Sequence, residues 1–290
     1  MNKLEHLLAV KNEVGETPIW IPGEQALYWL DIEGQRVYRY DPATGAVQSF
    51  HVDVPVTALA RRRKGRWLLA TKTGLSFWDG GATHSTFIVN PETHPDLRFN
   101  DSAVDRQGRL LAGSINQKDL SAADGSLYRL DPDLTIHTID TGYALANGIG
   151  FSPDGRTVYV TEMFRNRILA HDYDTAAGTV KNRRTFATVP ADAGFPDGLT
   201  VDRDGFVWSA HWGGSRVTRY DPAGTIEREI RLPVPNVTCM GFGGKDLNEL
   251  YITTGWFMMT AADRKKHPLA GDLFRMKTDV QGLVEPVFAG

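Results

Sequence analysis

The chain repeats one short pattern six times. Three copies align at once: FNDSAVDRQGRLLAGS at 99–114, NGIGFSPDGRTVYVTE at 147–162 and DGLTVDRDGFVWSAHW at 197–212. Each has a short apolar run, a turn that contains glycine and then alternating apolar residues, which is the signature of a β-hairpin. Weaker copies occupy 15–31, 56–72 and 237–254. A period of 40–50 residues indicates a repeat architecture such as a propeller.

Each copy is followed by two more segments with the pattern of strands. The third segment alternates and ends in a turn residue, as in 37–42 and 217–222, and the fourth follows it, as in 47–52 and 226–232. Four antiparallel strands in each of six units predict an all-β, six-bladed β-propeller that occupies residues 1–290 as a single domain. One short helix is expected in a loop, around 260–266.

A propeller must also close its ring. We expect the N-terminal strand, about Leu4 to Val10, to pair with the last blade near Val284 to Phe288, because this pairing hides two sheet edges that would otherwise be open.

Composition excludes several classes of protein. The 290 residues carry 32 Lys and Arg against 35 Asp and Glu, a net charge of −3, so there is no basic field for a nucleic acid. Cys239 is the only cysteine, which rules out an intramolecular disulfide and a Cys-based metal cluster. There is no apolar run of about 18 residues, and the first residues do not resemble a signal peptide. We therefore expect a cytoplasmic monomer that binds neither nucleic acid nor a membrane.

Aligning the six copies places one polar residue of each at the start of its first strand. The spacings along this column are 41, 43, 47, 50 and 41 residues, and its members are Glu16, Thr57, Asn100, Asn147, Asp197 and Thr238. The innermost strands of a propeller line its central channel, so these side chains are expected to converge. Two carboxylates at a narrow channel mouth raise each other's pKa or require a cation between them.

The residue types in the column favour a hard cation. Glu16, Asn147 and Asp197 supply oxygen ligands, Asn100 can add another, and the column contains no His or Cys. The alternative is that Asn147-Gly148 and Asp197-Gly198 are ordinary hairpin turns and that Glu16 is a solvated strand end. Their common register favours an open site for a divalent cation.

Four motifs in these segments carry a family resemblance. They are GETPIW at 15–20, RFND at 98–101, NG at 147–148 with SPDG at 152–155, and PDG at 196–198. With these motifs the chain resembles, over essentially its whole length, the family of senescence marker protein 30 (regucalcin), gluconolactonase and luciferin-regenerating enzyme. The resemblance implies a six-bladed propeller in which Glu16, Asn147 and Asp197 bind one divalent ion, which is Ca, Zn, Mn, Mg or Fe(II). It also implies that Arg98 and Asn100 hold a sugar lactone.

The function expected from this resemblance is metal-dependent hydrolysis of an aldonolactone to its aldonic acid in a sugar oxidation pathway. Asp197 is the candidate catalytic base, because a carboxylate beside the metal can deprotonate the attacking water. Two departures leave the sugar open: Gln117-Lys118 stands where animal members have an acidic substrate contact, and Thr17 stands where they have glycine.

Two alternative functions stay open. One is a phosphotriesterase-like hydrolase, and the other is a non-enzymatic calcium-binding propeller. Some neighbouring side chains also have two interpretations: Arg98 would otherwise form a surface ion pair, and Trp212 and Trp256 either wall the cavity or pack in the core or rim. We expect His211 to be a structural histidine.

Overall fold

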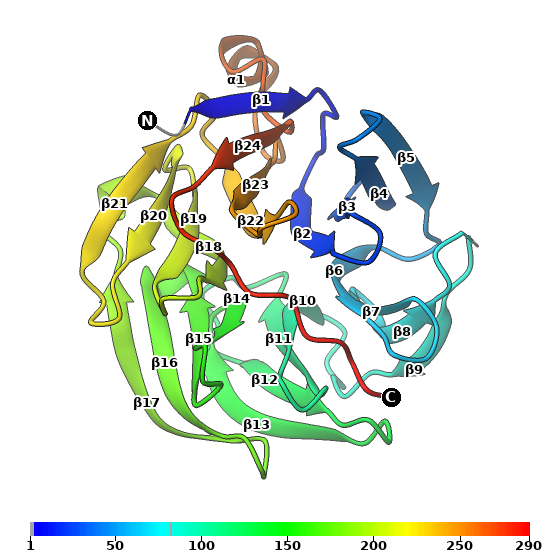
Figure 1. Ribbon diagram of the computed structural model, residues 1–290. Coiled ribbons are helices and arrows are strands. Elements are labelled where there is room, and N and C mark those ends of the chain that lie inside the picture. The colour runs from blue at the N-terminus through cyan, green and yellow to red at the C-terminus, as the bar shows by residue number, and fades with distance from the viewer. Residues whose placement is uncertain (1–2, 82) are drawn as a thin grey trace.

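Six four-stranded antiparallel sheets surround one axis in the computed structural model, which describes residues 3–81 and 83–290 (Figure 1). The prediction of an all-β, six-bladed propeller is confirmed. Blade one contains β2 (Gly15–Ile21), β3 (Ala26–Asp31), β4 (Arg36–Asp41) and β5 (Ala46–His51). Blade two contains β6 (Val56–Arg61), β7 (Trp67–Thr71), β8 (Gly74–Trp78) and β9 (Thr86–Val89). Blade three contains β10 (Leu97–Val104), β11 (Leu110–Asn116), β12 (Gly125–Leu130) and β13 (Ile136–Tyr143).

The next two blades have the same order, with the first strand of each at the axis. Blade four contains β14 (Ala146–Phe151), β15 (Thr157–Glu162), β16 (Arg167–Asp174) and β17 (Thr179–Thr188). Blade five contains β18 (Phe195–Val201), β19 (Val207–Trp212), β20 (Arg216–Tyr220) and β21 (Ile226–Arg231). Adjacent blades are held together by apolar and aromatic packing, as where the rings of Trp208 and Phe242 meet edge to face at 5.6 Å.

Blade six is completed by the N-terminal strand. Its inner strands are β22 (Val237–Gly243), β23 (Glu249–Thr254) and β24 (Leu273–Lys277), and β1 (Leu4–Leu8) pairs antiparallel with β24, with Leu4 opposite Met276. The expected closure by an N-terminal strand is confirmed, but the expected partner near Val284 to Phe288 is wrong. The chain leaves the sheet after β24, so the open edge is that of β24 itself.

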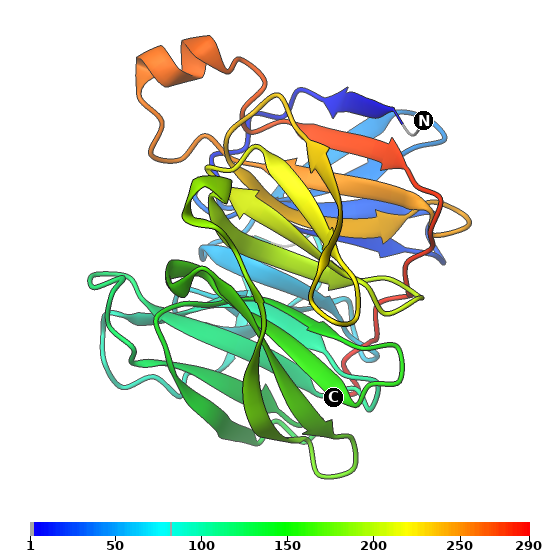
Figure 2. The same ribbon diagram turned by 90° about the vertical axis from the view of Figure 1, so that its left-hand side faces the viewer.

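The C-terminal segment instead forms a strap across one end of the channel, which we define as residues 279–290 (Figures 1 and 2). Its backbone bonds to four blades: Arg203 N donates to Gln281 O, Gly282 N to Leu247 O, Phe288 N to Arg61 O and Ala289 N to Gly108 O, each at 2.8 or 2.9 Å. The Phe288 side chain is fully buried between blades two and three. The strap therefore closes the ring a second time.

Helices are short and lie in loops. The α-helix α1 (Ala261–Lys266) follows β23, which confirms the short helix expected around 260–266. Thr260 caps it, since its hydroxyl accepts from the Asp263 N–H. Two 3-10 turns, η1 (Met163–Arg165) and η2 (Ala191–Ala193), follow β15 and β17. Among the described residues no helix has the length and apolar character needed to cross a membrane.

We predict that a chain beginning at Ala9 is destabilised by at least about 2 kcal/mol, because it exposes the edge of β24 and the apolar surface that Leu4, Leu7 and Leu8 cover. Urea denaturation of the two chains measures the difference. Glu5→Ala is the matched control: it removes only the exposed ion pair with Arg275, so its cost should stay under about 1 kcal/mol. Equal stability of the shortened and full chains would show that β1 does not hold the last blade.

Candidate active site

Each inner strand carries a β-bulge at the residue of the polar column. The register with the second strand shifts between Glu16 and Ile19, between Val56 and Ala58, and at the corresponding place in the other four blades. A bulge changes the direction in which a side chain leaves its strand, and bulges are common beside functional sites. In blade one the bulge includes Thr17, which adopts the left-handed region with φ of 49° where the family resemblance expects glycine.

The two Asx-Gly dipeptides are not turns. Gly148 and Gly198 lie inside β14 and β18, the innermost strands of blades four and five. A Cβ on Gly148 would lie 2.5 Å from the Asp197 carbonyl oxygen, and one on Gly198 would lie 2.5 Å from Cys239 Sγ. These glycines therefore allow neighbouring inner strands to approach closely around the axis, which excludes the alternative interpretation of Asn147 and Asp197 as turn residues.

Five of the six column residues line one cavity of about 350 Å³ at the end of the channel where the inner strands begin. They are Glu16, Thr57, Asn100, Asn147 and Asp197, and the cavity has a volume typical of small-molecule sites. Thr238 is the exception. Its buried hydroxyl donates to Gly15 O at 2.5 Å and lies 2.9 Å from the Thr253 hydroxyl, so it ties blade six to blade one rather than facing the cavity.

Three carboxylates line the cavity, and we call the part of its surface that they form the cavity floor. Glu16 and Asp197 are buried, and loss of hydration together with the negative charges of their neighbours holds the pKa of each well above its ordinary value. The third is Asp101, whose pKa burial raises to about 6. The sequence analysis included Asp101 in the RFND motif but assigned it no role. Its position next to Asn100 of the polar column could have indicated that it also lies at the cavity. Among the described residues, no Lys, Arg or His lies within 4 Å of these three carboxylates.

The donor set fits a hard divalent cation. Buried carboxylates without a basic partner are stabilised by a metal ion or by protonation. In the described part of the chain no three His, Cys, Asp or Glu side chains are grouped closely enough to hold an ion by themselves, so the ion would need other oxygen donors, among which the Asn147 amide is available in the cavity. Asn147 lies beside Asp197: its Nδ2 donates to Asp197 Oδ1, and its Oδ1 accepts from Gly148 N at 3.0 Å. Rotation of the amide by 180° would turn its oxygen toward an ion bound by Asp197. Glu16, Asn147 and Asp197 are thus the residues that would hold the ion.

Arg98 and Asn100 supply the polar side wall. Arg98 Nη1 donates to Phe99 O at 2.9 Å and lies 3.4 Å from Asn100 Oδ1, while its buried Nε has no hydrogen-bond partner. Burial lowers the pKa of Arg98, and the charge of Glu33 opposes that shift. No ion pair of Arg98 occurs among the described residues, so the alternative of a surface ion pair is wrong. Its guanidinium is available to a ligand.

The remaining side chains named from the sequence divide between the cavity and its surroundings. Trp212 lines the cavity, whereas Trp256 lies outside it, donating from Nε1 to Lys11 O at 3.0 Å beneath Arg264. Lys118 is exposed, and Leu120 from the same loop reaches the cavity instead. His211 is structural: it is buried, Nδ1 lies 3.0 Å from Ala193 O, and burial lowers its pKa to about 4.

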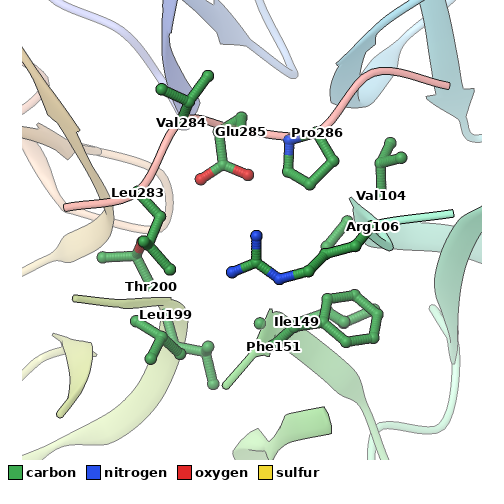
Figure 3. Close-up of a pocket in the computed structure, with 13 residues that line it drawn as sticks. Val104, Arg106, Ile149, Phe151, Leu199, Thr200, Leu283, Val284, Glu285 and Pro286 are labelled. Carbon is green, nitrogen blue, oxygen red and sulfur yellow. The ribbon is translucent and has the colours of Figure 1, made fainter. Parts of the chain in front are cut away.

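A smaller cavity of about 60 Å³ lies at the opposite end of the channel, beneath the C-terminal strap. Figure 3 shows the Glu285 carboxylate and the Arg106 guanidinium pointing toward each other across it, with Leu283 and Pro286 beside them. The strap therefore covers this end of the channel with side chains, whereas the cavity of about 350 Å³ lies at the other end.

We predict that the chelator-treated protein is less stable at pH 8 than at pH 5. A pKa of about 6 for Asp101 means that the folded state holds its proton more tightly than the unfolded chain, so the free energy of unfolding falls as pH rises toward and through 6. Asp101 lowers the free energy of unfolding only between the ordinary pKa of an aspartate and its folded-state pKa of about 6. About one pH unit of that interval lies above pH 5, so Asp101 contributes about 1 kcal/mol to the loss between pH 5 and pH 8. Denaturant unfolding at the two pH values measures it.

Asp101→Asn should reduce that loss. Asp154→Asn is the matched control, because a hydrogen bond from Ser152 lowers the pKa of Asp154 and its contribution changes only below about pH 4. Stability that does not change with pH in the wild-type protein, or a loss that Asp101→Asn leaves intact, would contradict this account of the floor.

Comparison with known proteins agrees with the geometry. The family model described as SMP-30/Gluconolactonase/LRE-like region matches residues 14–256. The chain is 37% identical over 278 residues to a pentonolactonase of Haloferax volcanii (94% of this chain, 93% of that protein) and 35% identical over 297 residues to regucalcin of Xenopus laevis (99% of each). A solved structure of a calcium-binding protein, regucalcin, from Agrobacterium tumefaciens superimposes with a TM-score of 0.93 at 25% identity, covering 99% of this chain and 97% of that one. The chain belongs to the SMP-30/gluconolactonase/luciferin-regenerating enzyme family.

Proposed function

We propose that this protein hydrolyses a sugar lactone to the corresponding aldonic acid with the help of one divalent cation. The observation that carries the proposal is the cavity floor, where Glu16, Asp101 and Asp197 lie together with the Asn147 amide and without a basic partner. The names of two relatives support the reaction class: the pentonolactonase above, and a 6-deoxy-6-sulfogluconolactonase of Pseudomonas putida. We further propose that the protein acts as a cytoplasmic monomer within a sugar oxidation pathway.

The reaction needs a polarised carbonyl, an activated water and a route for one proton. A divalent ion bound by Glu16, Asn147 and Asp197 would supply Lewis-acid polarisation of the lactone carbonyl. The Asp197 carboxylate acts as the general base that takes the proton from the attacking water. Asp197 then returns that proton to the ring oxygen as the carbon–oxygen bond breaks, so the product is the open hydroxy acid.

Arg98 and Asn100 orient the substrate. The guanidinium presents several N–H groups in a fixed plane, which suits recognition of hydroxyl and carbonyl oxygens in one direction. Because Arg98 Nη1 is already anchored on Phe99 O, its remaining donors face the cavity in a defined position. The Asn100 side chain lies next to it and completes this polar wall.

We predict that chelation abolishes lactone turnover and lowers the melting temperature, since a ligand bound only by the folded state stabilises it. The measurement is a panel of aldonolactones with a pH-indicator readout, with spontaneous hydrolysis subtracted, on stripped protein to which Ca, Zn, Mn, Mg or Fe(II) is restored one at a time. A phosphotriester included in the panel tests the phosphotriesterase-like alternative. Metal binding with no turnover of any ester would favour the non-enzymatic calcium-binding propeller instead.

Two isosteric variants separate the roles of the carboxylates. Asp197→Asn keeps an oxygen ligand but removes the base, so kcat should fall by roughly 10²–10⁴ with metal still bound. Glu16→Gln leaves the base in place and weakens the charge balance of the ion, so metal affinity should fall and high metal concentration should partly restore the rate. Asn100→Ala should leave metal bound and lower kcat/KM. Near wild-type kcat in metal-loaded Asp197→Asn would place the base elsewhere.

A further inference from the structure

Outside its floor, the large cavity has few polar side chains. Apart from Asn147, the charged, amide and hydroxyl side chains that line it come from blades one to three, and we call them the polar side: Glu33, Thr57, Arg98 and Asn100. The other lining residues are apolar or aromatic and come from every blade except the second, including Val14, Ile32, Ile115 and Leu120 of blades one and three. Arg98 and Asn100 have a role in the proposed function, whereas Glu33 and Thr57 have none so far.

The hydroxyl of Thr57 is buried without a partner. Thr57 is 2% exposed, and its Oγ1 forms no hydrogen bond among the described residues. A buried hydroxyl that is left unpaired costs free energy, and valine would fill nearly the same space without that cost. In blade six the corresponding hydroxyl, that of Thr238, donates to Gly15 O. The fold therefore uses the Thr238 hydroxyl, and the Thr57 hydroxyl remains available to a ligand.

The Glu33 carboxylate is paired through one oxygen only. Oε1 accepts from Lys72 Nζ at 2.6 Å, across the boundary between blades one and two. In the part of the chain that the structure describes, Oε2 has no hydrogen-bond partner. Because both oxygens of a carboxylate accept hydrogen bonds, Oε2 can accept from a hydroxyl group of a ligand in the cavity.

This charged pair projects from two anchored connections. In the connection between β7 and β8, the Lys72 N–H donates to Pro55 O at 3.0 Å. In the connection between β3 and β4, a Cβ on Gly34 would lie 2.5 Å from Asp31 Oδ2, so glycine is needed beside Glu33. The carboxylate is therefore held in place before any ligand arrives, which reduces the entropy lost on binding.

Glu33, Thr57 and Arg98 together match the hydrogen-bonding capacity of a sugar. A carboxylate accepts, a guanidinium donates, and a hydroxyl does both. The charge of Glu33 opposes the fall in the pKa of Arg98 that burial causes, so the two groups lie within electrostatic reach of each other. A sugar hydroxyl can donate to the carboxylate while a neighbouring one accepts from the guanidinium, and hydrogen bonds to charged groups are the stronger ones. A lactone without hydroxyls would leave these groups unpaired, which weakens its binding.

We propose that Glu33 and Thr57 form, with Arg98, a subsite that binds hydroxyl groups of the lactone, and that Lys72 is the positioning residue that holds Glu33. The substrate class is then a lactone with hydroxyl groups on neighbouring carbons, and the same ring without hydroxyls is selected against. This inference rests on the proposed lactonase function and assigns the residues that give it specificity.

The test compares lactones that share a ring and differ in hydroxylation. One pair is D-xylono-1,4-lactone and γ-butyrolactone, and the other is D-glucono-1,5-lactone and δ-valerolactone. The selectivity ratio is kcat/KM for the hydroxylated lactone divided by kcat/KM for its partner, each first divided by the spontaneous hydrolysis rate constant. With metal-loaded wild-type protein the selectivity ratio should be at least about 100, because a site built for hydroxyls rejects analogues that lack them.

Glu33→Gln should lower the selectivity ratio by roughly 10- to 100-fold, mainly through a higher KM for the hydroxylated lactone. Lys72→Met should lower it by a smaller factor, because the carboxylate remains but is held less firmly. Glu24→Gln is the matched control and should leave the ratio unchanged. The Glu24 side chain is 31% exposed against 30% for Glu33, and it also faces basic side chains, those of Arg39 and Arg61, but it does not line the cavity.

Thr57→Val separates binding from stability. It should lower the selectivity ratio by about 3- to 10-fold, the effect of one neutral hydrogen bond, without lowering the melting temperature of the metal-free protein. Thr238→Val is its control in the same column: it removes a hydroxyl that bonds to Gly15 O, so it should lower the melting temperature and leave the selectivity ratio unchanged.

A direct binding measurement needs no turnover. D-Glucono-1,5-lactam keeps the hydroxyls of the lactone but is not hydrolysed, and calorimetry on metal-loaded protein should show its Kd rising roughly 10- to 100-fold in Glu33→Gln. An unchanged selectivity ratio and an unchanged Kd in Glu33→Gln would overturn the subsite and leave the proposed function intact. Absence of turnover on all four lactones, with each metal restored, would instead overturn the proposed function itself.

Discussion

The close approach of six inner strands to one axis is the constraint on which the rest of this molecule depends. Where β14 meets β18, and β18 meets β22, the backbones approach so closely that only glycine fits at Gly148 and Gly198. The residue before each glycine is forced toward the axis by the bulge in its strand. Asn147 and Asp197 therefore reach the channel as a consequence of the packing that closes the ring.

This packing has an electrostatic cost, which is also the source of chemistry. Glu16, Asp101 and Asp197 lose hydration and repel one another, so each has a raised pKa in the absence of a cation. A propeller tolerates such a cluster because the six blades bury enough apolar surface elsewhere, and because the strap and β1 fix the ring at both ends of the chain. The free-energy cost of burying these carboxylates is thus offset by stabilising contacts elsewhere in the fold.

The residues that line the cavity have different structural origins. Thr57, Arg98 and Asn100 of the polar side are carried on inner strands, whose bulges and ring packing fix their positions. Phe164, Phe257 and Met258, which also line the cavity, lie in connections between strands, where residues can change without disturbing the ring.

The sequence by itself determined the number of blades, the order of their strands, the polar column and the closure by an N-terminal strand. It did so because hairpin periodicity and a fixed repeat are local properties of the chain. The tertiary structure decided which residues face the cavity. Thr238 bonds blade six to blade one instead of facing the cavity, Trp256 packs outside it, and Asp101 lies on the cavity floor.

The tertiary structure also decided which strand pairs with β1. The apolar residues near Val284 to Phe288 have the pattern of a strand, yet Phe288 is buried between blades two and three and the edge of β24 is left for β1. The apolar side chains that line the cavity could not be identified from the sequence either, because they come from separate strand ends and connections that only the closed ring brings together. Contacts between residues far apart in the chain depend on how the blades pack, and a repeat pattern contains no information about that packing.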